Sequence, residues 1–113
     1  MKEFLLIFRA DLTTMPSRTP EQMQEQTRKW MDWIGGIAAR DKLKDRGNRL
    51  MPEGKVLRSE SLITDGPYME IKESILGYSV IKAISWETAV EIAKGCPIFK
   101  SNGSVEVREI SIL

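Results

Sequence analysis

Histidine is absent from this 113-residue sequence, and cysteine occurs only once. The missing histidine removes the commonest general acid and base, the commonest zinc ligand and every nucleophile that a histidine side chain activates. A structural zinc site without histidine needs several cysteines, and this chain has only Cys96. The sequence therefore predicts no metal site.

Long apolar runs and a marked charge excess are also missing. No apolar stretch reaches the roughly 18 residues that a membrane span requires, and the chain starts with a strand pattern in place of a basic signal region. We therefore expect a cytoplasmic protein that does not interact with membranes. Lysine and arginine number 17 against 16 aspartates and glutamates, and the formal charge of +1 gives no global argument for nucleic-acid binding.

Length and composition indicate one globular domain over residues 1–113. Hydrophobic residues make up 42% of the chain and charged residues 29%, an ordinary balance for a packed domain. The lone Cys96 cannot form an internal disulfide, so we interpret it as a small buried apolar residue, with a reactive thiol as the alternative. The basic stretch within residues 40–58 is interrupted by acids and predicts a solvated loop and edge strand.

The first half of the chain predicts a strand followed by a long helix. Residues 2–9 are β-prone and apolar on both alternating faces, which is typical of a central strand. Residues 19–22 supply an N-cap, a proline at the first helical position and a capping-box glutamine, and the helix should extend to about Arg40. Its apolar stripe consists of Met23, Thr27, Trp30, Ile34, Ile37 and Ala38. Gly35 and Gly36 lower helix propensity here, which favours close backbone contact over an earlier helix end.

The second half predicts two strands, a helix and a last strand. Residues 55–63 are expected to form the second strand and residues 75–84 the third, which is again apolar on both faces. Ser85 caps a helix that ends at Gly95, and residues 105–112 form the last strand. The resulting order β-α-β-β-α-β predicts an α+β, ferredoxin-like fold with a four-stranded antiparallel sheet and two helices on one face.

That order leaves one face of the sheet without a cover. Two helices can shield only one side of a four-stranded sheet, yet the first and third strands are apolar on both sides. A second copy of the chain is the simplest source of the missing cover. We therefore expect a homodimer.

A turn motif, Asp65-Gly66-Pro67-Tyr68, precedes the third strand. Aspartate can accept hydrogen bonds from the backbone ahead of it, glycine tolerates positive φ, and proline fixes its own φ. Two acids and a lysine follow within a few residues. Together with the terminal run at residues 103–110, this segment resembles the YCII-related, or DGPF, family.

The resemblance covers most of the chain, from residues 2–8 to its end, with Tyr68 standing where that family usually has phenylalanine. It implies a dimeric α+β barrel, in which two sheets face each other. Some members of the wider group use a His-Asp pair in a cleft, which cannot be carried over to a chain without histidine. One relative acts as a dehydrochlorinase without a cofactor, and we expect no cofactor here.

The turn supplies the first candidate site. If residues 68–72 are extended, Tyr68, Glu70 and Lys72 share one face and can line a small polar recess next to Asp65. Asp65 or Glu70 would then be the catalytic proton acceptor, Tyr68 a proton donor and Lys72 a clamp for an anionic ligand. The alternative is a turn capped by Asp65 and followed by solvated ion pairs of small energetic weight.

Two further sets of ligand-binding candidates lie outside the turn. Arg9 at the end of the first strand and Arg108 on the last strand can hold a carboxylate or phosphate at the mouth of a pocket. The alternative is a pair between Arg108 and a glutamate, across strands or across the dimer interface. Trp33 lies about a quarter turn off the helix stripe and can roof a cleft or enter an interface, with core packing as the alternative.

Two classes of function follow. The first is a small homodimer that binds an anionic or aromatic metabolite in a cleft, with cofactor-free acid/base chemistry suited to isomerisation, elimination or hydrolysis. The second is a non-enzymatic ligand sensor or interaction module linked to transcriptional regulation, because family members also occur joined to sigma-factor-like proteins. Buried carboxylates facing an open cavity would favour the enzyme, and a groove without them would favour binding alone.

Overall fold

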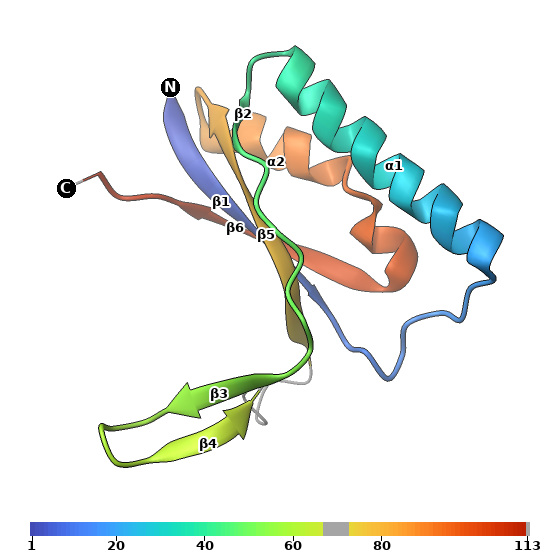
Figure 1. The fold of residues 1–113 in the computed structure, drawn as a ribbon. Helices are drawn as coiled ribbons and strands as arrows, with labels where there is room; N and C mark the ends of the chain where they lie inside the picture. The colour runs from blue at the N-terminus through green and yellow to red at the C-terminus, as the bar shows by residue number, and fades with distance from the viewer. Residues whose placement is uncertain (67–72, 113) are drawn as a thin grey trace.

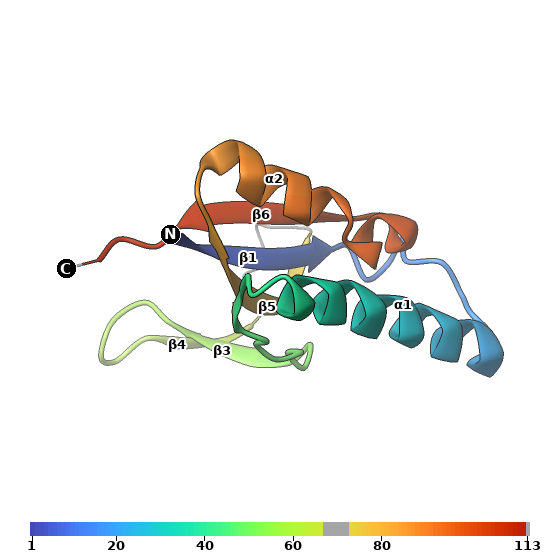
Figure 2. The ribbon, with the colours of Figure 1, turned by 90° about the horizontal axis from the view of Figure 1, so that it is seen from above.

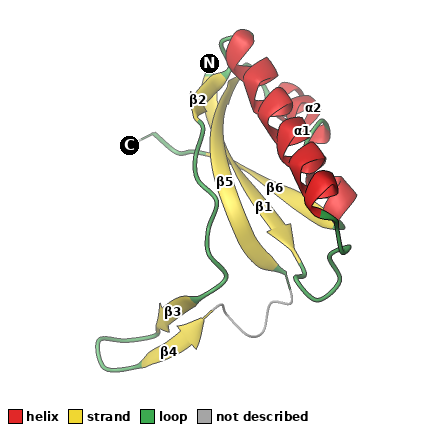
Figure 3. Cartoon of the chain, turned by 45° about the vertical axis from the view of Figure 1, so that its right-hand side comes forward, coloured by secondary structure: helices red, strands yellow, loops and turns green. Residues whose placement is uncertain are grey.

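The computed structural model describes residues 1–66 and 73–112 and shows an antiparallel sheet with helices on one face (Figures 1 and 3). Four strands form this sheet in the order β2-β5-β1-β6, and both neighbours of β1 run antiparallel to it. Their bounds are β1 (Lys2–Ala10), β2 (Leu43–Asp45), β5 (Ser74–Ala83) and β6 (Gly103–Glu109). The helices are α1 (Pro20–Ala39), α2 (Trp86–Lys94) and the 3-10 helix η1 (Pro97–Ser101). The predicted α+β, ferredoxin-like fold class is confirmed.

The two α-helices begin where their capping residues predict. Thr19 accepts a hydrogen bond from the backbone N–H of Gln22, whose side chain accepts from the Thr19 N–H, and this completes the capping box. Ser85 caps α2 through the N–H of Thr88. The predicted close backbone contact at Gly35 and Gly36 is wrong, because no atom lies within 4 Å of where their Cβ atoms would be. Within the described residues, no helix combines the length and the apolar character needed to cross a bilayer.

The predicted second strand over residues 55–63 is wrong. These residues fold back on themselves as the hairpin of β3 (Gly54–Leu57) and β4 (Ile63–Gly66), which is a separate two-stranded sheet. Two hydrogen bonds close the turn between these strands. Leu62 N–H donates to the Ser59 side-chain oxygen Oγ at 3.1 Å, and Arg58 N–H donates to the backbone oxygen of Leu62 at 2.8 Å. Figure 1 shows the hairpin projecting away from the main sheet and the helices. β2 takes the edge position of the main sheet instead.

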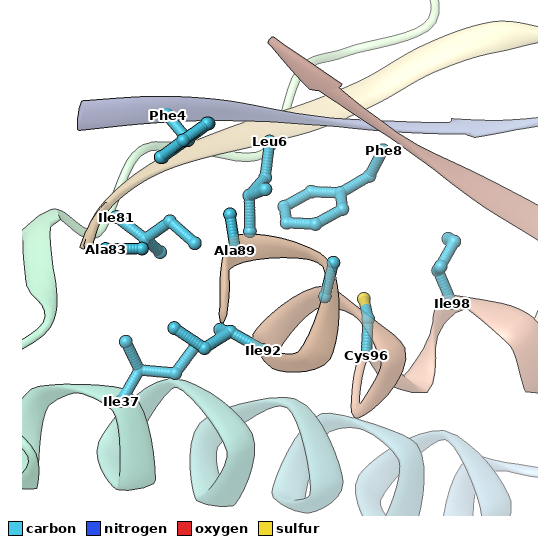
Figure 4. Close-up of a cluster of buried hydrophobic side chains, with 11 residues drawn as sticks. Phe4, Leu6, Phe8, Ile37, Ile81, Ala83, Ala89, Ile92, Cys96 and Ile98 are labelled. Atoms are coloured by element: carbon cyan, nitrogen blue, oxygen red, sulfur yellow. The ribbon is translucent and has the colours of Figure 1, made fainter. Parts of the chain in front are cut away.

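The core lies between the sheet and the helices (Figure 4). Alternate residues of β1 point toward the helices, so Phe4, Leu6 and Phe8 are buried while their neighbours on β1 are less so. Figure 2 shows both helices running along β1. The remaining buried core side chains come from β5, both α-helices, η1 and the link between α2 and η1: Ile81, Ala83, Ala89, Ile92, Ala93, Ile37, Ile98 and Cys96. The prediction that Cys96 is a buried apolar residue is confirmed, and burial raises the pKa of its thiol to about 12.

The predicted central strands, β1 and β5, occupy the two inner positions of the sheet. On the face away from the helices, Leu5 pairs with Val80 and Ile7 with Tyr78. All four side chains are only half-buried, since no helix of the described chain covers them. We call this surface the open face; it also carries Arg9 and charged residues of β5 and β6.

Candidate functional site

Helix α1 is much longer than α2, and this difference creates a cavity. At about 1.5 Å per residue, the 20 residues of α1 extend roughly 30 Å and the nine of α2 only about 13 Å. The end of α1 packs into the core, where Ile37 is fully buried, whereas Met23 near its start is 58% exposed. Figure 1 shows the start of α1 reaching past α2 and η1.

The cavity has a volume of about 440 Å³ and lies between the first two-thirds of α1, the loop before it, strands β1 and β5, and η1. The volume falls within the ~300–1,000 Å³ range of small-molecule sites. Most of its lining atoms are apolar. The residues from α1 and its preceding loop are Met15, Arg18, Met23, Gln26, Thr27, Trp30, Met31 and Ile34. The other walls are formed by Phe8, residues 46–49, residues 76–79, Ile98 and Ser101.

The α1 wall shares Met23, Thr27, Trp30 and Ile34 with the apolar stripe predicted from the sequence. Its members recur every three or four residues, as one face of a helix requires. Trp30 and Ile34 of this stripe are half-buried, whereas Met23 and Ala38 are exposed. Only the part of the stripe that faces α2 and the centre of the sheet finds packing partners. The part over the cavity remains available to a ligand.

An aromatic cluster stands at the inner end of the cavity. Phe8 contacts Trp30 and Trp33 edge to face, with ring centroids 4.9 and 5.9 Å apart, and the two tryptophans are 5.8 Å apart. Phe8 and Trp30 line the cavity, whereas Trp33 does not. Trp33 Nε1 donates to Ile92 O at 3.1 Å, which ties α1 to α2. The structure thus places Trp33 against the core, behind the cavity wall.

The wall opposite α1 contains a segment that we call the arginine strap, residues 46–49. It runs along β5: Ser79 Oγ donates to Arg46 O at 2.7 Å, and Tyr78 N–H donates to Asn48 O at 3.2 Å. Two glycines permit this close approach. Gly47 has φ +73°, and a Cβ there would overlap the carbonyl of Tyr78. A Cβ at Gly77 would lie 2.8 Å from Asn48 O.

The charged lining is of one sign. Arg18, Arg46 and Arg49 line the cavity, and no aspartate or glutamate of the described chain does. Arg18 Nη2 donates to the backbone oxygen of Lys100 at 2.9 Å. Within residues 1–66 and 73–112, no group of three or more potential metal-binding side chains gathers. The cavity therefore suits an apolar molecule that carries negative charge.

The predicted catalytic cluster cannot be assembled from the described residues. Asp65 lies on β4 of the projecting hairpin, where its exposed carboxylate pairs with Lys55 Nζ at 2.5 Å. Tyr68, Glu70 and Lys72 lie outside the described residues. Asp65 does not line the cavity. Its role, and those of the other three residues, stay predictions.

Arg9 and Arg108 meet on the open face, away from the cavity. Glu106 accepts from Arg9 Nε at 3.2 Å and from Arg108 Nη1 at 3.3 Å. The hydrogen bond from Arg108, and to a smaller extent the one from Arg9, holds the pKa of Glu106 below its usual range. The pair of Arg108 with Glu106 lies within β6 and not across strands as the alternative predicted, whereas the pair of Arg9 with Glu106 joins β1 to β6. The structure therefore brings Arg9 and Arg108 together around Glu106, and places Trp33 and Asp65 elsewhere.

The arginine strap is the part of the site that sequence reasoning missed. Its residues read as a solvated basic loop because acids interrupt the charge run. One of those acids, Asp41, pairs outside the cavity with Lys82 at 3.6 Å, and the basic Lys44 pairs with Glu3 of β1 at 3.9 Å. The signal that could have located the strap is Gly47 between two arginines, since glycine permits close approach to another strand.

A comparison with curated proteins gives no match. A family model does match, and its description is the YCII-related domain. The match extends over residues 12–112 and so includes both helices, the arginine strap and the Asp65-Gly66-Pro67-Tyr68 motif from which the resemblance was inferred. The chain belongs to the YCII-related family.

Proposed function

We propose that this protein binds a small organic molecule in the cavity beneath α1 and acts as a homodimer. The observation that carries the proposal is the cavity itself, about 440 Å³ in volume and walled mostly by apolar side chains. An apolar cavity of this size with a few polar groups at its walls is the usual form of a small-molecule site. Its three methionines, Met15, Met23 and Met31, have flexible and polarisable side chains that adapt to the shape of a ligand.

The described lining favours binding without catalysis. It contains no carboxylate, lysine or thiol, and the side chain of Tyr78, a residue that also borders the cavity, lies on the open face opposite Ile7. Ser79, a potential nucleophile, donates its hydroxyl to Arg46 O and has no base beside it. Acid/base chemistry would require a carboxyl from the turn segment, as predicted for Asp65 and Glu70. On the described residues, a ligand-binding module is the better supported proposal.

A filled cavity should abolish binding. We expect Thr27→Trp to remove the thermal stabilisation that ligands give in a screen of small organic acids and aromatics, because the indole occupies space beneath α1. Gln24→Trp adds the same side chain to an exposed position of α1 that does not line the cavity, and should keep all hits. A ligand that binds only the native state raises the melting temperature, so differential scanning fluorimetry reports the result. Hits that survive equally in both variants would rule out this cavity as the site.

The open face supports the homodimer. Leu5, Ile7, Tyr78 and Val80 form an apolar strip on two neighbouring central strands, with arginines and glutamates around it. Contiguous apolar surface of this kind, rimmed by polar residues, is typical of a protein interface. A second sheet placed face to face would bury both strips, as in the dimeric α+β barrel that the family resemblance implies.

A charge in the apolar strip should dissociate the dimer without unfolding the chain. We expect the wild-type protein to scatter light with twice the chain mass, and Leu5→Glu to reduce this to the mass of one chain. The new carboxylate would lie across from Arg108 on β6 in the separate chain, but would be buried in a dimer. Val90→Glu on the outer surface of α2 is the matched control and should remain dimeric. A wild-type protein that is monomeric at micromolar concentration would contradict the proposal.

A further inference from the structure

We infer that the ligand is an organic acid whose carboxylate is bound by Arg46 and Arg49 while its apolar body lies against the α1 wall. This inference rests on the proposed function, because it names the ligand class of the same cavity. Its first support is the one-sided charge of the lining: three arginines and, in the described chain, no acid. An unbalanced cluster of guanidinium groups attracts an anion and disfavours a cation.

The two strap arginines are the ones available to a ligand. Arg18 already donates to the backbone oxygen of Lys100. Within residues 1–66 and 73–112, Arg46 and Arg49 have neither an ion pair nor a side-chain hydrogen bond, although acids are plentiful elsewhere on the surface. The neighbouring Asp45 accepts at 2.8 Å from the N–H of Gly47. A planar guanidinium binds a carboxylate through two parallel hydrogen bonds, so two such groups provide more donors than one carboxylate needs.

The backbone beneath these arginines is fixed before a ligand arrives. Hydrogen bonds to β5 are made by Arg46 O and Asn48 O, and Leu50 N–H donates to Leu76 O at 2.8 Å just after the strap. Asn48 Nδ2 also donates to the hydroxyl of Tyr78 at 3.2 Å. A strap held at both ends places its two arginines with little loss of backbone entropy on binding. Such preorganisation increases affinity without adding contacts.

The opposite wall determines the rest of the ligand. Trp30, Met31 and Ile34 line the cavity from α1, and Leu76 lines it from β5. None of these side chains is charged. An anionic group on the part of the ligand that contacts them would therefore be buried without a partner. An aromatic or aliphatic body with a single carboxylate satisfies both walls. The strap fixes its acid end, and the adaptable methionines accept variation in its body.

The test compares 2-naphthoate with 2-naphthamide, which has the same ring system and no charge. We expect isothermal titration calorimetry to show about tenfold tighter binding of the carboxylate, equivalent to about 1.4 kcal/mol. The double variant Arg46→Gln/Arg49→Gln should lose this preference and keep its affinity for the amide. Lys29→Gln/Lys100→Gln removes the same charge from exposed positions outside the cavity and should keep the preference.

Each other outcome has a distinct meaning. Equal affinity of the wild-type protein for both compounds overturns the acid class but leaves the proposed function standing. Tighter binding of 2-naphthyl phosphate than of 2-naphthoate overturns the carboxylate in favour of a phosphate. If the strap variant loses both compounds while its melting temperature is unchanged, the arginines do not discriminate charge and the inference fails. Failure of the proposed function would be seen in a different experiment, because ligands would then still raise the melting temperature of the Thr27→Trp variant.

Discussion

Replacing Gly47 with alanine should lower the free energy of unfolding by about 2–5 kcal/mol. The residue has φ +73°, where a side chain costs about 1–2 kcal/mol, and a Cβ there would overlap the carbonyl of Tyr78 on β5. Relief requires the arginine strap to move away from β5, which adds a cost of about 1–3 kcal/mol of the kind seen for overpacking. Urea unfolding followed by tryptophan fluorescence measures the loss.

Gly35→Ala is the matched control for this change. Gly35 lies inside α1 with no atom within 4 Å of where its Cβ would be, so the same added methyl group meets no neighbour. Because alanine is the better helix former, this variant should gain about 1 kcal/mol of stability. If Gly47→Ala were as stable as Gly35→Ala, the strap would not pack against β5, and the cavity would lose one wall. Ligand affinity should fall in Gly47→Ala even under conditions in which it stays folded.

The fold was predictable wherever local signals agree with tertiary packing. Thr19 and Ser85 mark both helix starts through capping chemistry, and β1 and β5 carry apolar residues on both faces, as inner strands do. The edge strand β2 was not predictable, because it has only three residues and no alternating pattern. Its place is set by pairing with β5, where Leu43 lies opposite Ile81. Residues 55–63 are β-prone on both sides of Ser59, so their pattern alone does not show that the chain turns there to pair β3 with β4.

The site was less predictable than the fold. A helical stripe of apolar residues has the same periodicity whether it packs on a core or walls a cavity, and only the length of α2 decides between the two for Met23. Gly47 near two arginines signals a close approach to another element, but nothing in the order of Arg46, Gly47 and Arg49 reveals that this element is β5 or that the segment borders a cavity. The turn residues were candidates because of their sequence motif. Asp65 is the one ionisable residue of that predicted cluster within the described chain, and it lies on an exposed hairpin.

Truncation of Phe8 should have the other large effect. Phe8 is 5% exposed, contacts Trp30 and Trp33 edge to face, and separates the core from the cavity. Phe8→Ala should lower the free energy of unfolding by about 3–5 kcal/mol, because the lost ring leaves a void that joins the existing cavity. The tryptophan emission of the native state should also change, since two of the three indoles lose a contact. Phe99→Ala, at a position that is 49% exposed, should cost less than 1 kcal/mol on the usual scale of surface changes.

A second variant separates the packing role of Phe8 from its role as a cavity wall. Phe8→Leu keeps most of the volume and should cost about 1.5 kcal/mol or less, so the protein stays folded for binding measurements. The leucine removes the aromatic surface that Phe8 presents to the cavity, while the strap remains in place on β5. Affinity for 2-naphthoate and 2-naphthamide should then fall by the same factor, because both share the ring that Phe8 contacts and only the arginines distinguish them. A loss confined to the carboxylate would show that Phe8 acts through the strap, and would contradict the division of the cavity into an apolar end and an arginine end.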